Sequence, residues 1–223
     1  MLDSRLRLAA DFVRQGSRVA DIGTDHAHLP VALVNEGRSA FAIASDIREG
    51  PVANAHRTVE EAGLGHAVSV RLGNGLQTVH PDEVDDIIIA GMGGETIAMI
   101  LEEAPWVKNE RYRLILQPMT RAEKLRAYLF ENGFAINEER VTRVGRHWYT
   151  VLCAAYSGEV TTAEDAKCFV GRVPITEGAG YLQTVENRLA KQQAACPTPE
   201  GEACLQRVRD YRNGTWHPWE EDT

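Results

Sequence analysis

Residues 19–30, VADIGTDHAHLP, gather polar side chains around one glycine. Two acids, Asp21 and Asp25, flank the glycine, and two histidines, His26 and His28, follow it. Carboxylates and imidazoles bind cations, accept hydrogen bonds and move protons, and neither a buried strand nor a plain turn needs so many of them. This stretch is therefore a candidate binding or catalytic loop.

A second unusual loop follows the most apolar run of the chain. Residues 85–94, DDIIIAGMGG, predict a central parallel strand, buried on both faces, that ends in a glycine-rich turn. In an open α/β sheet the ligand lies beyond the carboxyl ends of the strands, at the point where the strand order reverses. Both loops follow strands that are expected at that point, so they predict one shared crevice.

The polar groups of this crevice favour S-adenosylmethionine over a dinucleotide. A pyrophosphate site needs several glycines in the pattern G-x-G-x-x-G, whereas the first loop has Gly23 alone, between Asp21 and Asp25. Carboxylates repel a pyrophosphate but attract the ammonium and sulfonium groups of the methyl donor. Asp46 closes the next strand, 25 residues past Asp21, and a carboxylate there accepts hydrogen bonds from ribose hydroxyls. Asn74, in a GNGL turn, is placed to meet the adenine amino group.

Strands and helices alternate along the first two thirds of the chain, which is typical of a doubly wound sheet. Strands are expected over residues 18–23, 39–46, 67–75, 85–94 and 112–119, with two more around Gly145 within 134–157, and helices over 4–15, 28–36, 51–63, 95–104 and 121–133. We therefore predict an α/β fold of five βα units, whose seven-stranded, mainly parallel sheet ends in an antiparallel hairpin.

The remainder of the chain has a different character. Gln, Ala, Glu and Arg dominate residues 160–214, and apolar residues recur at helical spacing on either side of a CPTPEG break at 196–201. This pattern predicts a helical hairpin, followed by a loose tail over residues 215–223. The predicted division is a cofactor-binding domain over 1–157 and a helical extension over 158–223.

Composition and charge limit the partners. The 223 residues carry a formal net charge of −8, whereas proteins that bind nucleic acid non-specifically are usually basic. A nucleic-acid partner would therefore need segregated basic groups. The chain offers such groups near the N-terminus, after the fifth strand, in the hairpin and in the C-terminal helices: Arg5, Arg7 and Arg14; Arg121, Lys124 and Arg126; Arg140, Arg143, Arg146 and His147; Arg188, Lys191, Arg207, Arg209 and Arg212.

Other partners are not expected. The chain has no run of about 18 apolar residues, which favours a cytoplasmic protein without membrane contact. Its four cysteines lack CxxC spacing, so no metal site is predicted. The sequence leaves the oligomeric state open between a monomer and a weak dimer.

Four motifs, in this order and spacing, resemble the TrmK family: DIGTDHAHLP, RLGNGL, IIIAGMGG and LILQPM. Members of that family are bacterial enzymes that methylate N1 of the adenine at position 22 of tRNA. The resemblance covers residues 1–157 closely and the helical extension in general outline. It implies a class I methyltransferase fold with a Rossmann-like sheet, S-adenosyl-L-methionine as cofactor, tRNA as partner, and a coiled-coil-like pair of C-terminal helices.

The chain departs from the family pattern in three of these motifs. Thr24 and His28 stand where the first family motif has Ser and Tyr, and Thr24 keeps the hydroxyl. Asn74 stands where the family has Asp, and it still offers an amide oxygen to the adenine amino group. Met119 stands where the family often has Asn, so a polar group near the acceptor base is lost. The last change bears on substrate detail more than on the reaction.

The candidate catalytic residues are Asp25, His26 and Gln117. Adenine N1 carries an in-plane lone pair and is uncharged at neutral pH, so methyl transfer requires positioning of the extracted base more than a strong base catalyst. An oxygen that accepts from the exocyclic amine would push electron density toward N1. These three side chains are the candidates for that contact.

The candidate binding residues gather at the strand ends. Those for the cofactor are Asp21, Ile22, Gly23, Thr24, Asp46, Ile47, Gly73, Asn74, Gly75, Gly91 and Met92. Those for the substrate are Gly93, Gly94, Pro118, Met119, Arg121, Lys124 and Tyr149.

Structural roles compete with several of these assignments. Asp25 could cap the following helix, the glycines of the second loop could serve only close packing, and the basic cluster at 121–126 could be a solvated helix face. The function also has rivals. One is a methyltransferase that acts on a small molecule or a protein, which would suit the acidic charge. Another is a non-catalytic cofactor-binding or RNA-docking module, which the intact polar groups of both loops disfavour.

Overall fold

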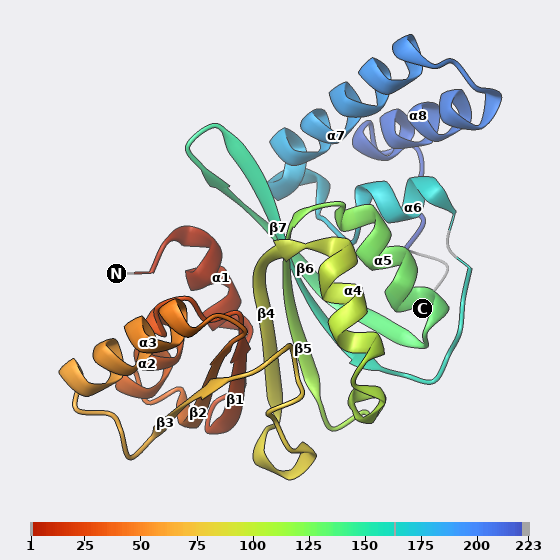
Figure 1. The fold of residues 1–223 in the computed structure, drawn as a ribbon. Coiled ribbons are helices and arrows are strands. Elements are labelled where there is room, and N and C mark those ends of the chain that lie inside the picture. The colour runs from red at the N-terminus through yellow and green to blue at the C-terminus, as the bar shows by residue number, and fades with distance from the viewer. Residues whose placement is uncertain (1, 163, 220–223) are drawn as a thin grey trace.

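A seven-stranded sheet runs through the centre of the molecule (Figure 1). The computed structural model describes residues 2–162 and 164–219. The strands are β1 (Ser17–Ile22), β2 (Ser39–Asp46), β3 (Val68–Leu72), β4 (Asp86–Gly93), β5 (Arg113–Thr120), β6 (Phe134–Val144) and β7 (His147–Tyr156). Their order is β3-β2-β1-β4-β5-β7-β6, and β7 alone runs antiparallel to both of its neighbours. The predicted doubly wound sheet with a terminal antiparallel hairpin is confirmed.

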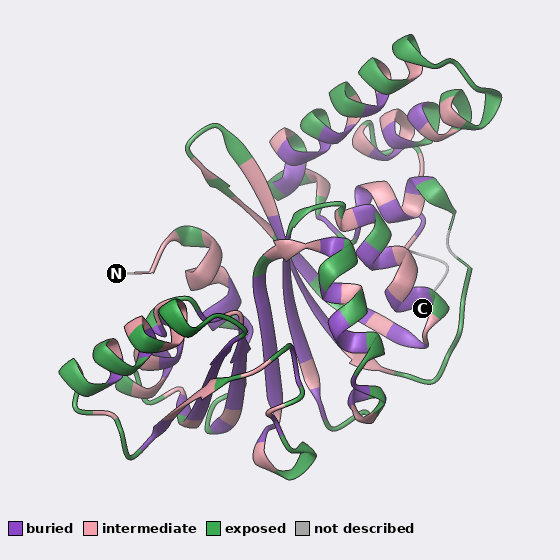
Figure 2. Cartoon of the chain, viewed as in Figure 1, coloured by how far each residue is buried: buried purple, intermediate pink, exposed green. Residues whose placement is uncertain are grey.

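Helices cover both faces of the sheet. They are α1 (Ser4–Phe12), α2 (His28–Asn35), α3 (Glu49–Glu61), α4 (Gly94–Glu102), α5 (Ala122–Glu131), α6 (Asp165–Val170), α7 (Ile175–Ala195) and α8 (Pro199–Arg212). The central strand β4 is buried along most of its length (Figure 2). Its Ile87 and Ile89 pack with residues of α4 and α5, whereas Ile88 packs with residues of α1 and α2. A strand that is covered on both faces is apolar without alternation, which explains the DDIIIA run.

The structure differs from the prediction in the number of βα units and contains one helix that was not predicted. A helix follows only four of the first five strands, because the connection from β3 to β4 contains just the single turn Pro81–Glu83. Glycines and a proline in this short connection oppose a longer helix. The short helix α6 was not predicted, and its six residues are too few to show a helical period. Within the described residues, no helix is long and apolar enough to cross a membrane.

The C-terminal helical hairpin is confirmed. Helices α7 and α8 pack through one apolar face each, with Leu182 and Val185 against Leu205 and Val208. The prediction of a loose tail is wrong for residues 215–219, because the Trp219 indole N–H donates to the Gly171 carbonyl at 2.8 Å. The remaining tail residues, 220–223, lie outside the described part of the chain.

A buried ion pair joins the extension to the sheet. The Arg126 guanidinium of α5 donates to the Glu139 carboxylate of β6 at 2.5 Å, and both side chains are almost completely buried. Arg126 also donates to the Cys168 carbonyl at 2.6 Å and to the Tyr181 hydroxyl at 2.9 Å. Burial by itself would lower the pKa of Arg126, but Glu139 and Tyr181 raise it above its ordinary value. Arg126 is therefore not part of a surface basic cluster.

We predict that Glu139→Gln strongly destabilises the protein. The neutral amide would leave the buried guanidinium without its counter-charge, which costs about 3–5 kcal/mol in the free energy of unfolding. Urea denaturation measures this loss. The neighbouring variant Glu138→Gln is the control, because the Glu138 carboxylate is half exposed and, within the part of the chain that the structure describes, pairs only with Arg140. It should change stability by less than about 1 kcal/mol, and equal losses in the two variants would contradict the prediction.

Candidate functional site

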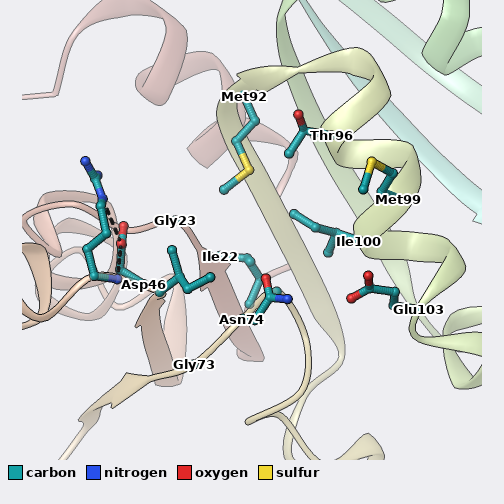
Figure 3. Close-up of a pocket in the computed structure, with 13 residues that line it drawn as sticks. Ile22, Gly23, Asp46, Gly73, Asn74, Met92, Thr96, Met99, Ile100 and Glu103 are labelled. Carbon is teal, nitrogen blue, oxygen red and sulfur yellow. Dashed lines mark hydrogen bonds and ion pairs between the residues drawn. The ribbon is translucent and has the colours of Figure 1, made fainter.

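The strand order reverses between β1 and β4, which lie side by side at the centre of the sheet. From β1 the chain continues to β2 on one side, and from β4 it continues to β5 on the other. A cavity of about 340 Å³ lies at the carboxyl ends of these strands (Figure 3). It is lined by Ile22, Gly23, Asp46, Ile47, Arg48, Gly73, Asn74, Gly75, Met92, Thr96, Met99, Ile100 and Glu103. The predicted crevice is therefore present at the predicted place.

Asp46 presents a carboxylate to this cavity from the end of β2. Its Oδ1 accepts a hydrogen bond from the Arg48 backbone N–H at 2.9 Å and lies 3.4 Å from Arg48 Nε. Among the described residues its Oδ2 has no hydrogen-bond partner, so that oxygen is available to a vicinal diol. Ile47 and Met99 line the same cavity and are 62% and 59% exposed. Such exposed apolar side chains suit a flat heterocycle.

Gly23 is favoured by its backbone conformation and lies against the end of a flexible side chain. Its φ is +80°, in the left-handed region that favours glycine, and a Cβ there would lie 2.2 Å from the Met92 methyl group. The amides of Gly23 and Thr24 both donate to the Ser45 carbonyl, at 2.7 and 3.0 Å. These bonds hold the first loop against β2, close to Asp46.

Asp21 is a buried carboxyl group beneath the first loop. It accepts a hydrogen bond from the Thr24 hydroxyl at 2.7 Å. Burial raises the pKa of Asp21 to about 6, the Thr24 bond partly offsets this, and the nearby Asp46 charge adds to it. The ionised form of Asp21 is therefore costly until a cation approaches it.

Backbone strain is concentrated in the loops that follow β1 and β5. Among the described residues, the non-glycine positions with positive φ are Asp25 (52°), Ala27 (54°) and Arg121 (57°). Such conformations cost free energy and are enriched at functional sites. The cap of α2 is Ala27, with no side-chain hydrogen bond, so the alternative that Asp25 caps this helix is wrong. The exposed Asp25 carboxylate instead lies 3.6 Å from His26 Nε2.

Gln117 differs from its expected role. It is completely buried, and its Oε1 accepts hydrogen bonds from the Gly91 N–H at 3.1 Å and from Arg5 Nη1 at 3.2 Å. Its amide group donates to the Pro118 carbonyl at 2.9 Å. The side chain thus joins the ends of β4 and β5 and has no surface through which to meet a base. Asp25 and His26 remain as the exposed catalytic candidates.

The glycines of the second loop differ in role: one is needed for close packing, and two leave space at the edge of the sheet. A Cβ on Gly94 would lie 2.3 Å from the Arg121 carbonyl, so the packing alternative holds for this glycine. Gly91 has a φ of +80° and open space around its Cα, and Gly93 is only moderately restricted. Gly91 and Gly93 therefore allow close approach to this edge of the sheet, and Gly94 does not.

Most of the predicted cofactor residues line the cavity. Asp21, Thr24 and Gly91 do not: the Thr24 hydroxyl donates to Asp21, and the Gly91 N–H donates to Gln117. Sequence reasoning missed Arg48 and four residues of α4 and its end: Thr96, Met99, Ile100 and Glu103. Their spacing places them on one face of a helix, and that helix follows the predicted strand 85–94. This helical spacing is a signal in the sequence that could have identified the four residues of α4 and its end.

The described residues contain no group of three or more His, Cys, Asp or Glu side chains able to hold a metal ion. The sheet order, the acid at the end of β2 and the cavity over the point of strand reversal together define the class. The protein has the architecture and the site of a class I methyltransferase.

Comparison with known proteins agrees with this class and refines it. The family described as "Methyltransferase domain" matches residues 2–152, so the chain belongs to it. The tRNA (adenine(22)-N(1))-methyltransferase of Bacillus subtilis is 40% identical over 153 residues, which cover 69% of this chain and 64% of that protein. The chain thus aligns with slightly less than two thirds of the length of this curated relative.

Two solved structures cover nearly the whole chain. The structure of B. subtilis TrmK has a TM-score of 0.74 and 32% identity over 96% of both chains. Sp1610 of Streptococcus pneumoniae, in complex with S-adenosyl-L-methionine, has a TM-score of 0.82 and 34% identity over 97% of this chain and all of that one. The protein belongs to the TrmK family.

We predict that the affinity for S-adenosylmethionine falls as the pH is lowered through about 6. Above this pH Asp21 is ionised and attracts the cationic ligand, and below it the neutral carboxyl does not. If binding of S-adenosylmethionine requires the ionised form of Asp21, binding at pH 5 should be about tenfold weaker than at pH 7. Titration calorimetry across this range measures the change. Asp21→Asn should remove the slope, and a variant that kept the wild-type profile would contradict the assignment.

Proposed function

We propose that the protein is an S-adenosylmethionine-dependent methyltransferase that methylates N1 of the adenine at position 22 of tRNA. The observation that carries the proposal is the cavity at the β1–β4 reversal, with Asp46 at its rim and the strained Asp25–His26 loop beside it. Relatives that match the chain are named as tRNA methyltransferases, which supports the choice of substrate. With tRNA as substrate, the protein would act in the cytoplasm.

The residues of the cavity fit the methyl donor. Asp46 Oδ2 would accept from the ribose hydroxyls, Ile47 and Met99 would enclose the adenine, and Asn74 would meet its amino group. Asp21, which lies outside the cavity lining beneath the first loop, would attract the positive charge of the methionine moiety from a distance. When bound there, S-adenosylmethionine would supply an electrophilic methyl group at the crevice.

The reaction demands little acid–base chemistry from the chain. Adenine N1 is already a neutral nucleophile, so the protein has to hold the extracted base in line with the methyl group. The exposed Asp25 carboxylate can accept from the exocyclic amine. It can also stabilise the positive charge that N1-methylation leaves on the ring. His26 Nε2 lies 3.6 Å from this carboxylate.

A protein of charge −8 needs exposed, unpaired cations to hold tRNA. Many of the predicted basic groups are instead paired with acids within the protein: Arg7 with Glu36, Arg14 with Asp86, Arg188 with Glu123, and Arg209 and Arg212 with Glu186. Exposed basic residues without an ion pair to any described acid are found after β5 and at the hairpin tip: Arg121, Lys124, Arg143 and Arg146. These residues would contact the phosphates around the target base.

The proposal divides the chain into two roles. Residues 1–157 would bind the methyl donor and the target base. Residues 158–223 would hold the hairpin in place and contribute to tRNA docking through Lys191 and Arg207. Both of these residues are found on the C-terminal helices, and Arg207 stacks on the Trp216 ring at 5.3 Å.

We predict methyl transfer to tRNA. Purified protein with labelled S-adenosylmethionine should label a tRNA fraction and leave protein and small-metabolite fractions unlabelled. A transcript with guanine in place of the adenine at tRNA position 22 is the control, because it lacks the acceptor nitrogen in the correct form. Labelling of protein or metabolites instead would favour the alternative methyltransferase, and labelling of both transcripts would refute the assigned position.

We predict that tRNA binding weakens steeply with salt, because each phosphate contact releases condensed counterions. Replacing both Arg121 and Lys124 by Glu should weaken tRNA binding and reduce the salt slope, with unchanged affinity for the methyl donor. Fluorescence titrations at several salt concentrations measure both effects. The matched control, Arg57→Glu with Lys108→Glu, makes the same change of charge away from the crevice and should have little effect. A flat salt profile would contradict tRNA as the substrate.

A further inference from the structure

Arg5, in the first turn of α1, reaches across to the carboxyl edge of the sheet. Its Nη1 donates to Gln117 Oε1 at 3.2 Å and lies 3.0 Å from Met119 Sδ. Its Nη2 donates to Asp3 Oδ2 at 2.6 Å. Its guanidinium carbon lies 5.3 Å from the centre of the Tyr149 ring, in a cation–π contact. One side chain thus contacts residues of β5, β7 and the loop that precedes α1.

These contacts converge on the acceptor side of the crevice. Gln117 Oε1, which Arg5 holds, also accepts from the Gly91 N–H at 3.1 Å. Gly91 begins the glycine-rich end of β4 that leads to Met92, a residue of the cavity lining. Met119 and Tyr149 remain partly exposed beside it. Arg5 therefore fixes three pieces of the surface on which an acceptor base would rest.

The attachment of α1 does not depend on this side chain. The helix is anchored by Ala9, Ala10 and Phe12, which are buried against the sheet, and the chain that follows it is held by Arg14, whose guanidinium pairs with the buried Asp86 at 2.6 Å. Arg7, on the same helix, pairs with Glu36 of the segment after α2 at 2.8 Å, away from these residues. Arg5 differs from both residues because its partners include Gln117, which joins the ends of β4 and β5.

The charge of Arg5 is compensated where it lies. Methylation of adenine N1 produces a cation, and an uncompensated positive charge nearby would oppose it. Asp3, at 2.6 Å, makes the pair nearly neutral while the guanidinium keeps its planar fork of donors. The Arg5–Asp3 pair can therefore position groups on the acceptor side of the crevice without adding net positive charge there.

We propose that Arg5 is a positioning residue for methyl transfer, which sets the floor of Met119, Tyr149 and the Gly91 turn under the acceptor base. This inference rests on the proposed function. It also predicts that lysine cannot replace arginine, because an ammonium cannot bridge the Gln117 oxygen and the Asp3 carboxylate in one plane while it lies over the Tyr149 ring.

The test compares Arg5→Ala, Arg5→Lys and Arg7→Ala. Single-turnover rates are measured with saturating tRNA and methyl donor, together with KM for tRNA, Kd for S-adenosylmethionine and the thermal midpoint. Arg5→Ala and Arg5→Lys should both lower the single-turnover rate at least tenfold, with KM and Kd changed less than about threefold, since small misplacements of reacting groups cost up to about a hundredfold in rate. Arg7→Ala, which loses a surface ion pair on the same helix, should keep the wild-type rate.

Several outcomes would overturn the inference. A wild-type rate for Arg5→Lys would mean that only the charge matters, and a rise in KM alone would mean a phosphate contact. Equal losses in Arg5→Ala and Arg7→Ala, or a lowered thermal midpoint with an unchanged rate, would mean that Arg5 only stabilises α1. Failure of the proposed function is a separate result, because the wild-type protein itself would then transfer no methyl group to tRNA.

Discussion

The carboxyl ends of β1 and β4 lie side by side, and the chain leaves them toward opposite sides of the sheet. Neither connection crosses the space between them, so a cavity opens there without any special packing. The groups of the candidate site lie at the ends of the strands on either side of this cavity. Asp46 and Gly23 end or follow strands on one side, and Met92 and Gly91 end the strand on the other. The chemistry of the site is therefore a consequence of strand order.

This constraint explains which parts of the site were predictable from sequence. Asp46 ends one predicted strand, and Gly23 and Asn74 lie within two residues of the ends of two others, so a strand pattern and a residue type suffice to place them. Arg5 could not be placed in this way, because its contacts with Gln117 and Tyr149 join positions more than 100 residues apart in the chain. Local patterns carry no information on such pairs. The burial of Arg126 could not be predicted for a similar reason, because its partner Glu139 lies on another element.

Charge was the least reliable guide. A cluster of arginines in the sequence resembles a phosphate-binding surface, yet the fold pairs many of these side chains with acids, as in Arg14–Asp86 and Arg188–Glu123. An acidic protein has enough carboxylates to neutralise most of its cations, and the fold decides which remain free. The free cations after β5 and at the hairpin tip lie at the edge that carries the cavity, where an anionic polymer would have to approach a buried methyl donor.

The helical extension packs against the hairpin whose tip carries two of these cations. Trp148 of the hairpin packs so closely on α7 that a Cβ on Gly180 would lie 2.4 Å from its ring, and Glu139 of the same hairpin is held by Arg126. A buried ion pair contributes little net stability compared with apolar packing, but it tolerates few alternative arrangements. Residues 165–212 therefore restrain the strands of the hairpin through both packing and a buried ion pair. If the tip contacts phosphates as proposed, a fixed distance between it and the cavity would favour one nucleotide of a folded RNA over its neighbours.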